Sequence, residues 1–213
     1  MDRKLNWSLE NPRLKLWLKS LIFGTGFIFL ALPPHSFIRN FLFLVLLAGL
    51  YFSLPEERRR FRVSLAILAG LSVAALNSFS AHLLIIPIGI AAALLFYFLA
   101  GLVSFDLGGA GRRFIYLALN NLFFLLAFIW VIFVTGSGSG IVGISAFIAV
   151  FAIAYFLSKE SFRFLQGDFP RREAVLAAGA AYLTVQLFWA LSFWPAGFVN
   201  TAIFLTIAAV LMR

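Results

Sequence analysis

Eight apolar stretches, each about 17 to 23 residues long, follow one another along the chain with only short breaks between them. A helix needs roughly 20 apolar residues to cross the hydrocarbon core of a bilayer. The sequence therefore predicts an all-α fold, a polytopic integral membrane helix bundle with eight transmembrane helices. The predicted spans cover residues 13–32, 36–53, 62–78, 82–104, 113–135, 141–158, 174–194 and 196–212.

The composition excludes an ordinary soluble domain. Hydrophobic residues make up 63% of the chain, charged residues only 12%, and the mean hydropathy is +1.02. Soluble domains are about half apolar and about a quarter charged. The chain has no cysteine, which excludes disulfides and thiolate metal sites.

The breaks between the spans contain proline, glycine or charged residues, which end helices. Asn11 and Pro12 have the types expected at an N-cap and at the first helical position. Residues 1–12 are therefore predicted to form a cytoplasmic interfacial arm, and the first span is predicted to be retained rather than cleaved as a signal peptide. Pro87 lies inside the fourth span, and a re-entrant segment there would leave seven spans.

The basic residues predict the orientation of the chain. The segments between spans, counted from the N-terminal segment, fall alternately into two sets. The set that includes the N-terminal segment holds sixteen of the seventeen lysines and arginines, all except Arg39, and all eight acidic residues. The positive-inside rule then places both termini in the cytoplasm, which requires an even number of spans. A cytoplasmic basic fringe that faces anionic lipids also accounts for the net charge of +9, so no nucleic acid partner is expected. The expected location is a prokaryotic cytoplasmic membrane.

Small residues predict where helices approach closely in lipid. Residues 13–213 are predicted to form a single transmembrane domain of four helical hairpins. Within it, small-residue faces occur in span three (Ala66, Gly70, Ala74), span six (Ser145, Ala149, Ala152) and span seven (177–181). These three spans are expected to be central.

Polar residues from four spans gather near the predicted outer boundary of the membrane. If their helix ends converge, Arg39 and the neighbouring amides could hold a lipid phosphate, because guanidinium binds phosphate in a bidentate manner. The alternative is that each side chain caps a helix or meets a headgroup separately. The candidate lipid- or substrate-binding residues are His35, Arg39, Asn40, Asn77, His82 and Asn200. Two histidines without other ligands do not predict a haem or metal site, so no metal and no cofactor is expected.

A second group of polar residues lies within spans five and seven. It consists of Asn120, Asn121, Thr184 and Gln186, all predicted to be buried. Interhelical hydrogen bonds are the usual reason for such residues, and a polar path for a substrate is the alternative.

The sequence contains no credible catalytic set. No Asp or Glu lies in the middle of a span, and Asp106 and the two histidines are predicted at opposite ends of the membrane. Intramembrane carboxylates mark ion-coupled transporters, so their absence argues against that class. The predicted loop of residues 159–173 mixes charges with phenylalanines, so it either lies on the bilayer or docks a cytoplasmic or membrane protein.

Two functions remain. The first is a non-catalytic subunit or scaffold of a membrane complex. The alternative is a carrier or flippase for a lipid-like or hydrophobic substrate, which would use the outer polar cluster. Membrane lipids are expected partners in either case.

Overall fold

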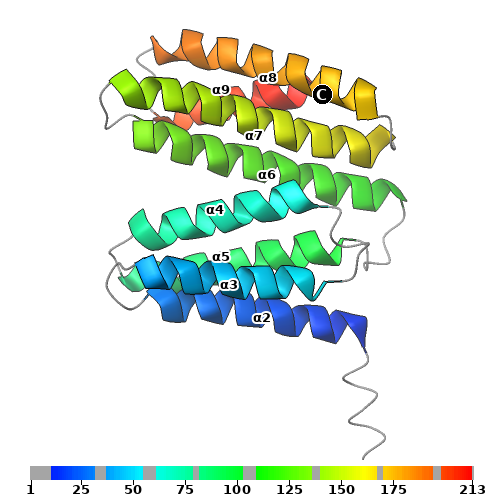
Figure 1. Ribbon diagram of the computed structural model, residues 1–213. Helices are drawn as coiled ribbons and strands as arrows, with labels where there is room; N and C mark the ends of the chain where they lie inside the picture. Colours follow the sequence, from blue (N-terminus) through cyan, green and yellow to red (C-terminus); the bar gives the residue numbers. More distant parts are fainter. Residues whose placement is uncertain are drawn as a thin grey trace, which may run out of the picture. The chain divides into compact units, whose positions relative to one another are not determined.

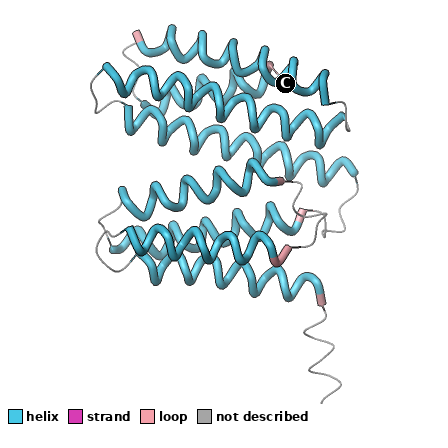
Figure 2. Tube along the Cα trace, in the orientation of Figure 1, coloured by secondary structure: helices cyan, strands magenta, loops and turns pink. Residues whose placement is uncertain are grey.

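The computed structural model describes residues 11–31, 37–54, 61–78, 82–102, 109–135, 140–166, 170–193 and 198–212. Within these ranges it contains eight α-helices and no strand (Figure 2). The helices, labelled as in Figure 1, are α2 (Pro12–Ala31), α3 (Phe37–Phe52), α4 (Arg62–Ser78), α5 (His82–Gly101), α6 (Gly109–Thr135), α7 (Gly140–Gln166), α8 (Pro170–Ser192) and α9 (Phe198–Leu211).

The all-helical fold is confirmed, and the predicted bounds agree with the helices to within four residues at all ends except one. The exception is the end of α7, which continues to Gln166 rather than stopping near residue 158. The prediction of a long loop over residues 159–173 is therefore wrong. Leu157, Ser161 and Phe162 are buried at helical spacing, so the packed face of α7 continues although the hydropathy falls.

The expected start of the first helix is confirmed. Pro12 is the first residue of α2, and the side-chain oxygen of Asn11 accepts a hydrogen bond of 3.0 Å from the backbone N–H of Arg13. This bond satisfies one of the N–H groups that have no partner within a helix. The N-terminal arm itself, residues 1–10, lies outside the described residues.

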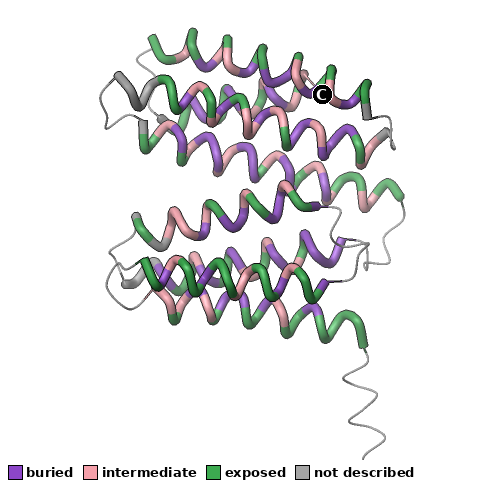
Figure 3. Tube along the Cα trace, in the orientation of Figure 1, coloured by how far each residue is buried: buried purple, intermediate pink, exposed green. Residues whose placement is uncertain are grey.

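Four helices are long and apolar enough to cross a membrane. The segments are Pro12–Ala31, Gly109–Val134, Ile144–Leu165 and Arg171–Ser192. Shorter apolar segments, Phe37–Phe52, Arg62–Ala75, Ile85–Gly101 and Val199–Leu211, lie in the other four helices. Each helix has exposed as well as buried positions (Figure 3). Many of the exposed positions carry large apolar side chains. Phe37 is 85% exposed and Phe29 72%, for example. Helices that are apolar all round indicate a membrane-embedded protein.

The chain divides into two compact units, Met1–Tyr116 and Leu117–Arg213, with the boundary inside α6. In the first unit the closest packing joins α2 and α5. A Cβ added to Gly24 would lie 2.7 Å from the Cβ of Ala93 and 3.1 Å from the carbonyl oxygen of Gly89. These two helices therefore approach at small residues, as helices in lipid do. They belong to different predicted hairpins.

In the second unit, α7 packs closely along α8. Ala177, Ala180 and Ala181 of the predicted small-residue segment 177–181 are buried on α8, whereas Gly179 is exposed and a Cβ added to it would meet nothing within 4 Å. On α7, Ala146 and Ala154 are buried, a shift from the predicted face of residues 145, 149 and 152.

The expectation for α4 is wrong. Ala66 and Gly70 are exposed, and a Cβ added to Gly70 would meet nothing within 4 Å. Small residues show where a second helix can approach, but they do not show that one does.

The packing of α2 on α5 gives the first testable prediction. Gly24→Ala should destabilise the protein by about 1–3 kcal/mol, because the added methyl group overpacks the contact with Ala93. Gly70→Ala is the matched control and should leave stability unchanged or slightly raised. The measurement is the free energy of unfolding in mixed micelles. Ala93→Gly should recover part of the loss, and equal stability of the two alanine variants would contradict the close approach.

Candidate functional site: a buried arginine and a groove

Arg39 lies in the first turn of α3 and is buried, with 3% of its side chain exposed. The apolar residues around it, Phe37, Ile38 and Phe41, are all exposed. The charged residue therefore faces the protein, while the aromatic residues face outward. This is the reverse of a soluble helix, and it is expected where the surroundings are lipid.

The guanidinium of Arg39 is held by α4. Its Nη2 donates a hydrogen bond of 2.8 Å to Oδ1 of Asn77, and Nδ2 of Asn40 lies 3.4 Å from the same oxygen. Nδ2 of Asn77 in turn donates to the carbonyl oxygen of Val73 at 2.9 Å. Both ends of the Asn77 amide are thus used, and a charge-assisted bond links α3 to α4.

The structure brings together three of the six residues proposed for the outer cluster, namely Arg39, Asn40 and Asn77. His35 lies outside the described residues, and so does the side chain of His82. Asn200 is an exposed residue of α9 in the second unit. Arg39 and Asn40 of α3 both direct a side-chain nitrogen to the same oxygen of Asn77.

The second predicted polar group is only partly buried. Asn120 is buried and Asn121 is half-buried on α6. Thr184 is buried, but its Oγ1 donates to the carbonyl oxygen of Ala180 at 2.7 Å, a bond within its own helix rather than between helices. The prediction that Gln186 is buried is wrong, because its side chain is exposed.

Sequence reasoning missed a polar cluster at the adjoining ends of α7 and α8. Glu173, in the first turn of α8, is 2% exposed, and its Oε2 lies 3.7 Å from Nε of Arg163. Ser158, Glu160 and Ser161 of α7 are also buried. The signal was available, because residues 154, 157, 158 and 161 continue one helical face. Among the described residues, no three histidine, aspartate or glutamate side chains are grouped as a metal site requires.

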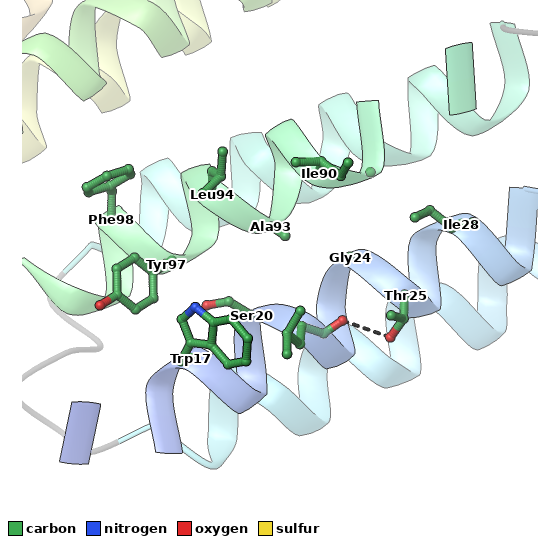
Figure 4. Close-up of a pocket in the computed structure, with 12 residues that line it drawn as sticks. Trp17, Ser20, Gly24, Thr25, Ile28, Ile90, Ala93, Leu94, Tyr97 and Phe98 are labelled. Atoms are coloured by element: carbon green, nitrogen blue, oxygen red, sulfur yellow. Dashed lines mark hydrogen bonds between the residues drawn. The ribbon is translucent and has the colours of Figure 1, made fainter. Parts of the chain in front are cut away.

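A groove of about 330 Å³ runs between α2 and α5 (Figure 4). Gly24, Gly89 and Ala93 contribute small residues to it, and larger side chains of both helices form its walls: Trp17, Leu21, Ile28, Ile90, Leu94 and Phe98. Trp17 and Tyr97 lie at one end, and Ile28 and Ile90 lie toward the other. Arg39, Asn40, Asn77 and Asn200, the described members of the predicted outer cluster, do not line this groove.

The chain matches no protein-family model, no curated protein and no solved structure.

The bond between Arg39 and Asn77 gives the second prediction. Arg39→Leu and Asn77→Leu should each destabilise the protein, and the double variant should lose less than the sum by about 1–2 kcal/mol, because the two side chains form one interhelical bond. The measurement is a double-mutant cycle of unfolding free energies. Pairing Arg39→Leu with Ser53→Ala, at the far end of α3, should give additive losses. Additivity in the first cycle would show that the bond contributes nothing.

Proposed function

We propose that this protein is a non-catalytic, multi-span membrane protein that serves as a subunit or scaffold of a membrane complex. The eight helices would cross a prokaryotic cytoplasmic membrane with both termini in the cytoplasm. Four helices have the length and apolarity for this, and the alternation of basic residues between the breaks supports the remaining four.

The observation that carries the proposal is the open small-residue face of α4. Ala66 and Gly70 are exposed, and no heavy atom approaches within 4 Å of a Cβ built on Gly70. In lipid, such faces let the backbone of a second helix approach closely, and they supply much of the attraction between helices. A helix of another polypeptide is therefore the partner that this face fits.

The burial and hydrogen bonding of Arg39 support the same proposal. It is the one basic residue outside the predicted cytoplasmic set, and its guanidinium is buried and bonded to Asn77 of α4. A residue used in this way stabilises the bundle. The segment predicted to dock a partner, residues 159–173, is largely helical, so a cytoplasmic partner would meet the ends of α7 and α8.

The second candidate is a carrier or flippase for a lipid-like or hydrophobic substrate. The observation that favours it is the convergence of Arg39, Asn40 and Asn77 from two helices. Under this proposal a lipid phosphate would exchange with Asn77 at the guanidinium.

Native mass spectrometry of the protein, extracted gently from its own host membrane, separates the two candidates. A stoichiometric second polypeptide is expected, and Gly70→Leu should release it by filling the α4 face. Gly49→Leu is the matched control, because Gly49 is also exposed with nothing within 4 Å but has Val45 and Ser53 as its neighbours one turn away. A lone protein that retains one defined lipid, lost on Arg39→Ala, would overturn the scaffold and support the carrier.

The predicted topology has a separate test, which the absence of native cysteine makes direct. Single cysteines replace Ser80 and Ser139 in predicted outer breaks, and Ser8 and Gly167 in predicted inner segments. A membrane-impermeant maleimide should label the first two in intact cells and the last two only after permeabilisation. Labelling of Ser139→Cys only from the inside would indicate an even number of preceding spans, rather than five, and contradict the proposal.

A further inference from the structure

The groove between α2 and α5 is mainly apolar, although Ser20, Thr25 and Tyr97 are among the residues that line it. Ser20 Oγ donates to the carbonyl oxygen of Leu16 at 3.0 Å. Thr25 Oγ1 donates to the carbonyl oxygen of Leu21 at 2.7 Å (Figure 4). The hydroxyls of Ser20 and Thr25 therefore direct their protons to their own helix. Trp17 and Tyr97, which also carry polar groups, lie at one end of the groove, and the rest of its walls offer an occupant mainly hydrocarbon and small residues.

The dimensions of the groove fit one hydrocarbon chain. From Trp17 to Ile28 the helix rises roughly 16 Å, which is about half of the ~30 Å hydrocarbon core and thus the depth of one leaflet. The groove has a volume of about 330 Å³. A whole helix, about 10–12 Å in diameter, does not fit inside it over that length, whereas a single hydrocarbon chain does.

The charges at one end of the groove identify the headgroup. Arg13 lies one helical turn before Trp17 on the same face of α2, and its side chain is exposed. Long side chains on a helix lean toward its N-terminus, so the guanidinium extends away from the apolar groove. Lys15 and Lys19 add positive charge to the same two turns, and Lys19 also donates to the carbonyl oxygen of Ser53. Trp17 and Tyr97 at this end have the residue types found at membrane interfaces.

We propose that this groove is a binding site for one acyl chain of an anionic membrane phospholipid, with the lipid phosphate at Arg13. The chain lies along Gly24, Gly89 and Ala93, and the walls from Trp17 to Ile28 and from Ile90 to Phe98 hold it against the two helices. The site is distinct from Arg39 and its amides, none of which lines the groove. It rests on the part of the proposed function that places α2 across the membrane, and the proposed orientation puts the lipid in the cytoplasmic leaflet.

The experiment is lipid retention by the full-length protein, measured by native mass spectrometry after delipidation and titration with phosphatidylglycerol. One phosphatidylglycerol should bind, about fivefold more tightly than phosphatidylcholine. Thr25→Trp, which places a large ring in the groove from an exposed position, should weaken retention at least tenfold, and Arg13→Gln about fivefold. A phosphatidylglycerol with a photoreactive acyl chain should crosslink to residues of α2 and α5.

Two matched variants serve as controls. Ile86→Trp adds the same ring at an exposed position of α5 outside the groove, and Arg113→Gln removes an exposed arginine near the start of α6. Both should retain the lipid as the unmodified protein does. Unchanged retention by Thr25→Trp, equal binding of the two lipids, or crosslinks confined to other helices would each overturn the proposal.

The experiments on the lipid site and those on the proposed function can fail independently. Lipid retention in the groove depends on residues of α2 and α5, whereas Gly70→Leu tests the scaffold and cysteine labelling tests the topology. Arg39→Ala should leave the groove lipid bound, while the carrier would lose its lipid with this variant.

Discussion

The apolar surface of the helices, which suits a bilayer rather than water, is the constraint on which the other features of this protein depend. A polar side chain inside a bilayer must find its partner within the protein. The hydroxyl groups of Ser20, Ser72 and Thr184 do so by donating to the carbonyl oxygen four residues earlier in their own helix. Such bonds satisfy the hydroxyl but do not link one helix to another. Helix association must therefore come mainly from packing, with Arg39 and Asn77 as an instance where side chains do connect two helices.

Packing in the first unit combines small residues with large rings. Gly24 lets α2 approach Ala93 of α5, and on the same two helices the rings of Phe23 and Phe96 stack with their centroids 5.2 Å apart. Phe43 of α3 joins them, with its ring centroid 5.7 Å from that of Phe23. The phenylalanines of α2 and α3 thus fill the space beside a close helix contact. Overpacking at Gly24 would separate the rings as well as the backbones.

The helices and most of their ends could be predicted from the sequence, but which helices pack against each other could not. Proline, glycine and charged residues end the apolar stretches, so most helix ends followed from them. The end of α7 did not, because hydropathy reports where the apolar surroundings end, whereas a helix continues as long as one face is packed, as at Ser161 and Phe162. The shared predicted depth of Arg39 and Asn77 left open whether they meet, and only the packing of α3 beside α4 brings them into a hydrogen bond. The groove could not be predicted, because the sequence does not show that α2 lies against α5, and only that contact brings Gly24 and Ala93 together.

The same small residues that let α2 and α5 approach also produce the groove beside their contact. A Cβ added to Gly89 would lie 2.6 Å from Ile28, so the helix contact itself closes the bottom of the groove, and larger residues such as Trp17 and Phe98 line its sides. In water a narrow apolar slot would remain poorly hydrated. In a bilayer the surrounding acyl chains can enter the slot and gain dispersion contacts with its walls. A close helix contact in lipid therefore creates a lipid site as a consequence of its geometry. Gly70 of α4 is the contrasting case, because nothing lies within 4 Å of a Cβ added there and no second wall forms a groove beside it; this is the face that we propose for a partner helix.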